Sequence, residues 1–258
     1  MNDDQRNAGA TGPGSAGQPD AASVPEGLVT AVVGLVDTGP VMLGAYTIAE
    51  LTAVDAIVDF LEARPSDEVL AEAVRSLAAR QLLLAGSSQE QVEVRGDLGI
   101  AVAFQQRARM VLDARSAGTE PGEPWRILVL PQPERICLVV RIDALGVHEI
   151  ALHKLDETLR MLTEWLPRGS AAGEEAVADA DALLTGSERS ALVTVTEYTA
   201  QGSAEIAGDS RDLILARRDG RLHALSRKRS AHQDGVLEPA TVDGKDGVRD
   251  RLLELIAA

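Results

Sequence analysis

The stretch Trp125–Leu166 constrains the fold more than any other part of the chain. It predicts a strand over Trp125–Leu130, a β-hairpin of Ile136–Ile142 and Val147–His153, and an amphipathic helix over Leu155–Leu166. The first hairpin strand is almost continuously apolar, so we expect it in the middle of a sheet with both of its faces covered. Leucines recur at helical spacing in the helix, which therefore packs one face on that sheet.

A looser copy of this order lies near the C-terminus. It has a strand over Leu192–Thr196, a hairpin of Asp212–Arg218 and Arg221–Ser226, and an amphipathic helix over Val248–Ile256. Asp219-Gly220 between the hairpin strands demands a type I′ turn. We therefore predict an α+β fold, with a mixed, mainly antiparallel sheet, flanking helices and a quasi-two-fold strand–hairpin–helix repeat. The alternative is coincidence, because hairpins followed by helices are common.

Composition divides the chain into four parts. Residues 1–27 are rich in Gly, Ala, Pro, Asp and Gln, and bury too little apolar surface to order themselves, so we expect a disordered tail. Residues 28–167 are the predicted N-terminal α+β half and residues 191–258 the C-terminal α+β half. The acidic, Gly/Ala-rich residues 168–190 are expected to form a linker between the two halves.

Shorter patterns fill the N-terminal half. The apolar runs Leu28–Val36 and Val41–Leu43 predict a short strand or hairpin, although a run this short also fits a helix. Thr47 and Glu50 have the spacing of a capping box, which starts a helix over residues 47–62. Further elements are a helix over residues 67–84 capped by Ser66 or Asp67, a strand at Val92–Val94, and a helical stripe over Ile100–Leu112.

Charge and hydropathy limit the partners and the compartment. A net charge of −15 argues against nucleic acid and against an anionic membrane surface, and it suits a basic or neutral protein partner. No apolar run reaches the ~20 residues that span a bilayer, and the N-terminus lacks the pattern of a signal peptide. The single cysteine fits a reducing compartment. We therefore expect a cytoplasmic protein.

Motifs for chemistry are missing from the sequence. His148 and His153 are separated by an odd number of residues on one strand, so they face opposite sides of the sheet. There is no His-Glu-x-x-His, Cys-x-x-Cys, Gly-x-Ser-x-Gly or phosphate-binding glycine loop. Cys137 has no activating neighbour and is expected to be a buried structural thiol. We expect no enzyme activity, no cofactor and no metal site.

Several segments resemble one family. The helix end Ser76-Leu77-Ala78-Ala79-Arg80-Gln81-Leu82-Leu83 is similar to the L-x-x-R-G-L helix end of the EspG family, the type VII (ESX) secretion-associated chaperones of actinobacteria. Similarity continues in the next helix, 98–115, in Ile136–Pro167, and in the pair Leu213–Arg218 and Arg221–Leu225 with the terminal helix. The chain differs in having Gln81 where Gly is usual, and in a second half without helices between its strands. The resemblance implies a cytoplasmic α+β protein that keeps helical secretion substrates soluble until export.

The leading hypothesis is therefore a non-enzymatic protein-binding module, an EspG-like chaperone whose partner is a helical secretion substrate. A partner groove would use the exposed ends of the C-terminal hairpin, around Arg217, Arg218, Arg221 and Arg227. Residues Arg227–Gly235 are interpreted as a polar loop, and the basic run Arg227–Arg229 within it as a solvated hairpin end that could also meet an acidic partner.

A winged-helix transcriptional regulator is the alternative. Helices over 47–62 and 67–84, followed by a hairpin region at Val92–Asp97, have the order of that fold. The second helix would be the recognition helix, but its N-terminal end carries Asp67, Glu68 and other carboxylates that phosphates repel.

Overall fold

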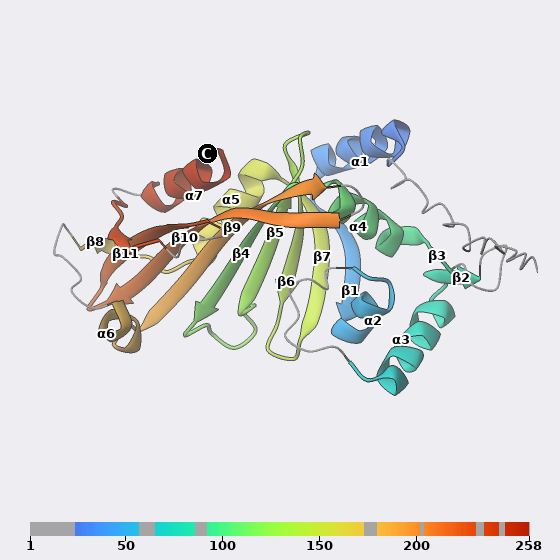
Figure 1. Cartoon of the computed structure of the whole chain (residues 1–258), viewed down its shortest axis with the longest axis horizontal. Coiled ribbons are helices and arrows are strands. Elements are labelled where there is room, and N and C mark those ends of the chain that lie inside the picture. Colours follow the sequence, from blue (N-terminus) through green and yellow to red (C-terminus); the bar gives the residue numbers. More distant parts are fainter. Residues whose placement is uncertain are drawn as a thin grey trace, which may run out of the picture.

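The computed structural model describes residues 24–56, 65–85, 92–172, 180–201, 204–230, 235–242 and 246–257. It confirms the α+β class, because one ten-stranded sheet, antiparallel except for β8, carries helices on both faces (Figure 1). The strands of the sheet are β1 (Val41–Thr47), β4 (Met110–Ala117), β5 (Arg126–Pro131), β6 (Ile136–Ile142), β7 (Val147–Lys154), β8 (Ser170–Ala171), β9 (Arg189–Gln201), β10 (Ala204–Arg218), β11 (Arg221–Arg229) and β12 (Glu238–Pro239).

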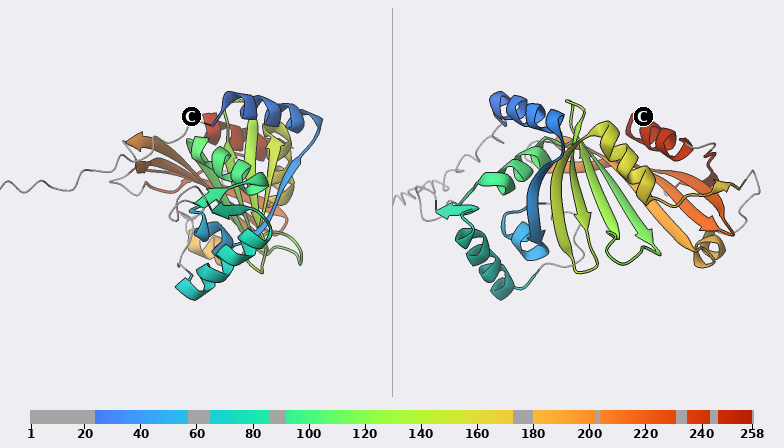
Figure 2. Two further views of the ribbon diagram at one scale, coloured as in Figure 1. Left: turned by 90° about the vertical axis from the view of Figure 1, so that its right-hand side faces the viewer. Right: turned by 180° about the vertical axis from the view of Figure 1, so that it is seen from behind.

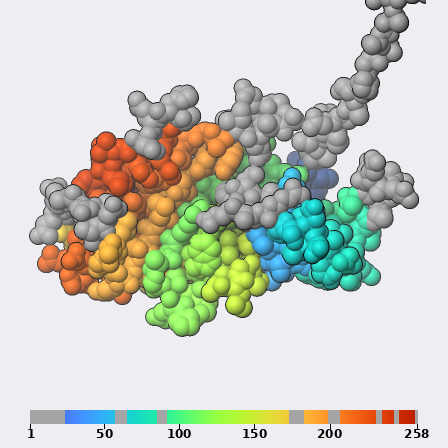
Figure 3. Space-filling model, turned by 60° about the horizontal axis from the view of Figure 1, so that its bottom comes forward, coloured from blue at the N-terminus to red at the C-terminus, as the bar shows by residue number. Residues whose placement is uncertain are grey.

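The remaining elements are a two-stranded ribbon and the helices. The ribbon and the α3 helix that precedes it project at one end of the molecule, away from the C-terminal strands (Figure 3). Their bounds are β2 (Leu83–Ala85), β3 (Val92–Val94), α1 (Glu26–Thr38), α2 (Ile48–Ala53), α3 (Asp67–Ala79), α4 (Gly96–Arg107), α5 (Leu155–Trp165), α6 (Ala180–Thr185) and α7 (Gly247–Ala257). Within the described residues, no helix has both the length and the apolar character that crossing a membrane requires.

The two predicted strand–hairpin–helix units lie on either side of β4. The strand order is β1-β7-β6-β5-β4-β9-β10-β11-β12, so β5, β6 and β7 run outward in one direction and β9, β10 and β11 in the other. The helix that ends each unit, α5 or α7, lies on the same face of the sheet (Figure 2, right). Strands from residues 28–167 and from residues 191–258 therefore belong to one sheet.

The two faces of the sheet are covered differently. On the front face, which Figure 1 shows, α1, α2 and α4 bury apolar side chains of β5, β6 and β7, such as Leu128, Leu138 and Ile150. On the back face, α5 and α7 bury the alternate side chains of both units, such as Val139 and Leu213. Strand β6 is thus covered on both faces, as its continuous apolar run predicted.

Local sequence signals set several boundaries. The Thr47 side chain accepts a hydrogen bond from the Glu50 backbone N–H, and the Glu50 carboxylate accepts one from the Thr47 N–H, which confirms the capping box. Ser66 caps α3. Asp219 and Gly220 have φ angles of 52° and 73°, both positive, as a type I′ turn requires.

Several predictions of local structure differ from the structure. Val41–Leu43 is a strand as predicted, but Leu28–Val36 adopts the alternative, a helix, because Val29, Val32 and Val36 lie on one face that packs toward β7. The stripe over Ile100–Leu112 is split: α4 ends at Arg107, and Met110 begins strand β4. Arg227–Arg229 continue β11 instead of forming a loop, because the ladder with β10 extends to the pair Ser210–Arg229.

Some of the predicted elements include residues outside the ranges that the structure describes. Most of the predicted tail lies in residues 1–23. The helix predicted over 47–62 is wrong beyond Ala53, where a turn follows in which Asp55 has a φ of 53°, and residues 57–62 lie outside the described ones. The helix predicted over 67–84 ends at Ala79, and Leu83 begins β2. Much of the predicted linker lies in residues 173–179, and its described parts include β8 and α6.

Candidate partner-binding surface

A buried carboxylate organises the far end of the sheet. The Asp212 side chain on β10 has no exposed surface and accepts bonds from two arginines of β11. Arg227 donates from Nε and Nη2 to Oδ2 at 2.9 and 2.7 Å, and Arg229 donates from Nη2 to Oδ1 at 2.9 Å. Thr194 on β9 adds a hydroxyl bond to Oδ1 at 2.9 Å. Four donors satisfy this carboxylate, which fixes both guanidinium groups in place.

This cluster lies on the front face, in a polar row that crosses several strands. The row takes one residue from each of five neighbouring strands, and each residue pairs in register with the next. In the order β5, β4, β9, β10 and β11, these residues are Leu128, Asp113, Thr194, Asp212 and Arg227. Residues that pair directly across a sheet point to the same face. The front face therefore changes from apolar over the first unit to charged over the second.

Asp113 is the centre of a second cluster in this row. Arg126 donates from Nε and Nη2 to its two oxygens, both at 2.8 Å, and its side chain is only 7% exposed. Arg115 donates to the same carboxylate at 2.9 Å and is half exposed. The two clusters share one chemistry, a carboxylate held by two arginines, but they differ in exposure. The Asp212 carboxylate is fully buried and both of its arginines are partly exposed, whereas around Asp113 one arginine is nearly buried and the other is half exposed.

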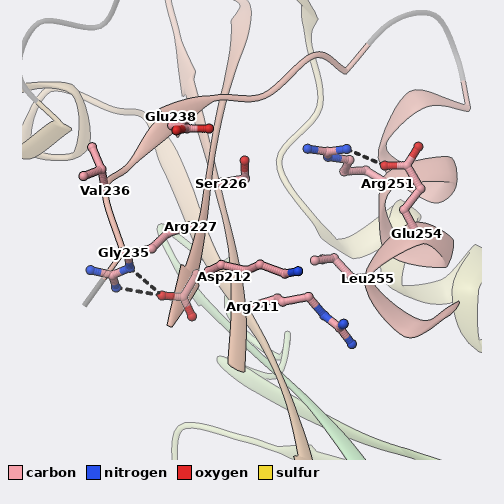
Figure 4. A pocket seen from close by; sticks show the side chains of 11 residues that line it. Arg211, Asp212, Ser226, Arg227, Gly235, Val236, Glu238, Arg251, Glu254 and Leu255 are labelled. Atoms are coloured by element: carbon pink, nitrogen blue, oxygen red, sulfur yellow. Dashed lines mark hydrogen bonds and ion pairs between the residues drawn. The ribbon is translucent and has the colours of Figure 1, made fainter. Parts of the chain in front are cut away.

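A pocket of about 430 Å³ lies beside the Asp212 cluster, between the β10–β11 strands and α7. Figure 4 shows Arg211 and Leu255 on the side of the strands that faces α7, and Arg227 with Asp212 on the other side. This alternation follows from the two-residue period of a strand. The residues that line it are Arg211, Asp212, Ser226, Arg227, Lys228, Gly235, Val236, Glu238, Arg251, Glu254 and Leu255.

Cations outnumber carboxylates in this lining, although the whole chain is strongly acidic. Arg211 forms an ion pair with Glu197 at 2.8 Å, while its Nε is buried without a hydrogen-bond partner. Arg251 pairs with Glu254 inside the pocket. Lys228 is exposed and forms no ion pair with any residue that the structure describes. The pocket is consequently a locally basic site on an acidic protein.

An apolar side chain borders these charges. Val236 is 79% exposed, and Leu255 of α7 closes the opposite wall. A surface that combines guanidinium groups with aliphatic side chains can bind a peptide through directional hydrogen bonds and through burial of apolar area.

The four predicted partner-binding residues occupy two places. Arg217, Arg218 and Arg221 lie together at the type I′ turn, where Arg217 pairs with Glu188 at 2.8 Å and Arg218 lies 3.9 Å from Asp219. Arg227 lies six residue pairs further along the hairpin, about 20 Å away by strand geometry. The structure thus brings only Arg227 to the pocket.

Residues that the sequence interpretation missed complete the site: Asp212, Arg229, Arg211, Lys228, Arg251 and Val236. One signal for Asp212 was present. A two-residue hairpin fixes its register, so counting back from the Asp219-Gly220 turn places Asp212 opposite Arg227. The amphipathic pattern predicts the helix α7 but not its position at the pocket, because that position on β10 and β11 depends on packing across the back face.

Two titratable side chains outside the pocket, Cys137 and His148, are buried in the sheet. Cys137 is fully buried, and burial raises the pKa of its thiol to about 12, as expected for an inert core cysteine. Burial lowers the pKa of His148, whose Nδ1 lies 3.0 Å from the Gly146 carbonyl oxygen. Among the described residues, no group of three or more His, Cys, Asp or Glu side chains could hold a metal ion.

Helix α3 and the β2–β3 ribbon follow one another as the recognition helix and wing of a winged-helix fold do, but the first turn of α3 is acidic. Helix α3 is followed by the β2–β3 ribbon, and its first turn carries Asp67 and Glu68. Arg75 pairs with Glu72 on the helix, and Arg80 pairs with the buried Glu50, so both arginines are already neutralised. Phosphates would meet little free positive charge here.

No family model and no curated protein matches the sequence.

Proposed function

We propose that this protein is a non-enzymatic protein-binding module, an EspG-like cytoplasmic chaperone that binds a helical substrate of type VII secretion. The observation that carries the proposal is the basic pocket between β10–β11 and α7, with exposed Val236 beside it. Arginine-rich surfaces with aliphatic neighbours are typical of protein interfaces. The sequence resemblance to the EspG family supplies the type of partner.

The surrounding fold supports this role. The Asp212 carboxylate holds Arg227 and Arg229, so these side chains lose little conformational freedom when a partner binds. The net charge of −15 keeps the protein soluble while it holds a client that tends to aggregate. A rigid, charged surface on a soluble sheet is well suited to transient binding.

The first test is a pull-down of the tagged full chain from its native cytoplasm, with mass spectrometry of the proteins that co-purify. We expect small helical secreted proteins at near-equal stoichiometry. A preparation with no partner, or one that contains DNA or transcription components, would contradict the proposal.

Two matched variants locate the surface in the same pull-down. Val236 and Leu145 are both strongly exposed aliphatic residues, at 79% and 88%, but Leu145 lies in the turn between β6 and β7. We expect Val236→Glu to lose the client and Leu145→Glu to retain it. The reverse pattern would move the binding surface to the first unit.

A winged-helix regulator is the second candidate, because α3 and the projecting β2–β3 ribbon have the order of that fold. The acidic first turn of α3 favours the chaperone proposal instead. Charge reversal of Arg75, with Arg75→Glu, separates the two, since it would weaken DNA binding by a recognition helix and leave client binding unchanged.

A further inference from the structure

The basic pocket has features that point to a particular ligand, and this inference rests on the proposed protein-binding function. Two of its three carboxylates are already neutralised, Asp212 by two arginines and Glu254 by Arg251, while the third, Glu238, is exposed on β12. Lys228 has no ionic partner among the described residues, and Arg211 retains one buried N–H without an acceptor. The pocket can therefore accept additional negative charge.

The cations are distributed on both sides of the same strand. Arg227 points to the front face with Asp212, and Lys228 points to the back face with Arg211, because these residues pair in register. β12 pairs with Leu225 and Ser226 of β11, and Gly235 lies against the backbone of Lys228. A segment bound at this end of the hairpin therefore meets Arg227 on one face and Lys228 on the other.

Aliphatic side chains lie between the charges. Val236 and Leu255 border the pocket, and their positions suit apolar residues next to acidic ones. The volume of about 430 Å³ is within the range of small-ligand sites, which limits the occupant to a short segment. Nucleic acid binding instead requires a basic surface that neutralises many phosphates along a backbone.

We propose that this pocket binds a short, extended acidic segment of the protein partner, in which Asp or Glu side chains alternate with aliphatic ones. The carboxylates pair with Lys228, Arg227 and Arg211, and the aliphatic residues cover Val236 and Leu255. A partner that is basic or neutral overall, as the net charge of this chain favours, can carry such an acidic segment, and charge complementarity directs that segment to the basic pocket.

The probe is a fluorescein-labelled short peptide of alternating Glu and Leu, measured by fluorescence anisotropy with the full chain. The control peptide replaces each Glu with Gln. The control variant is Arg221→Glu, because Arg221 and Lys228 are both exposed cations of β11 without an ion pair to any described residue. We expect Lys228→Glu to weaken binding about tenfold or more and Arg221→Glu to change it less than about twofold. Added salt should weaken the wild-type complex.

Circular dichroism confirms that each variant folds, and Lys228→Gln, which only removes the charge, should cause a smaller loss of affinity than Lys228→Glu. Equal binding of the Glu and Gln peptides would overturn the proposal, as would equal effects of Lys228→Glu and Arg221→Glu. A short DNA duplex that displaces the peptide more strongly than unlabelled peptide does would also overturn it, in favour of a phosphate site.

The outcome is separable from that of the proposed function. A client that co-purifies with wild type and with Lys228→Glu alike leaves the chaperone proposal standing and rejects the acidic-segment inference. Peptide binding that depends on Lys228, without any co-purifying helical client, supports the pocket inference and rejects the chaperone proposal.

Discussion

The two strand–hairpin–helix units have the same order of elements, but their front faces differ. Over β5, β6 and β7 the front face is apolar and is covered by α1, α2 and α4. Over β9, β10 and β11 it carries the Asp212 cluster, and the short α6 covers only a small apolar group around Ile214 and Leu225. Their back faces are alike, since α5 and α7 pack on a common apolar core.

This difference assigns separate roles to the two units: the first contributes mainly to stability, and the second also carries the proposed binding surface. The first unit buries apolar side chains on both faces, which provides most of the driving force for folding in that part of the sheet. The second unit uses its back face for the same purpose and leaves charged groups and a pocket at its end. Four measurements test this contrast, in order of decreasing expected effect.

Thiol reactivity should show the largest difference between the units. Burial raises the pKa of Cys137 to about 12, so at pH 8 its thiolate is ~10³-fold rarer than that of an ordinary cysteine. A Ser226→Cys substitution, made in a Cys137→Ala background, places a thiol in the pocket lining. We expect rapid iodoacetamide labelling at position 226 and almost none at Cys137 until urea unfolds the chain. Similar rates would mean that the first unit is open.

The two carboxylate clusters should differ in their contribution to stability. Asp113→Ala leaves the buried guanidinium of Arg126 without its carboxylate, which should cost about 3–5 kcal/mol of the free energy of unfolding. Asp212→Ala should cost less, about 1–3 kcal/mol, because Arg227 and Arg229 are 25% and 34% exposed and can turn toward water. Urea denaturation of both variants provides the measurement. A greater loss in Asp212→Ala would show that burial of the carboxylate, and not burial of its arginine, determines the cost.

Acidification should weaken the first unit through His148. Burial lowers the pKa of His148 below its ordinary value of 6.5, so the unfolded chain takes up a proton that the folded state resists. The stability contributed by neutral His148 is therefore complete above pH 6.5 and is lost as the pH falls through the folded-state pKa. We expect His148→Gln to reduce the difference in unfolding free energy between pH 7.5 and pH 5.5. An unchanged difference would show that His148 is not enclosed.

Pocket substitutions should have the smallest effect on stability. Lys228→Glu and Val236→Ser change exposed side chains that are not part of the described core. We therefore expect the free energy of unfolding, measured by urea denaturation, to change by no more than about 0.5 kcal/mol. Their effects should be confined to binding. A loss of several kcal/mol would make these residues part of the folding core and remove the distinction between the units.

Elements with local signals were predicted well from the sequence. The Thr47–Glu50 capping box, the Asp219-Gly220 turn and the central hairpin of β6 and β7 depend on neighbouring residues, and all of them are present. Leu28–Val36 was misassigned because its β-branched residues favour a strand, whereas packing against β7 selects a helix. Val111 and Leu112 continued the helical spacing of α4, but pairing with β5 and β9 places them in a strand.

The candidate site was only partly predictable. Arg227 was selected as an exposed hairpin end, yet its partner Asp212 follows from the register of the hairpin and was overlooked. The polar row through Asp113 and Thr194 joins strands that lie about eighty residues apart in the sequence, and the pocket also needs α7. Such non-local pairing leaves no periodic pattern in the sequence, so the surface could be found only in three dimensions.

Hydrogen–deuterium exchange of the free protein and of its purified client complex tests the central claim most directly, because it reports on both units in one experiment. We predict slower exchange in the complex for the end of β11 around Arg227 and for α7, with little change in β6 and β7. Slower exchange confined to α3 and the β2–β3 ribbon, or to the turn around Leu145, would contradict the assignment of binding to the second unit.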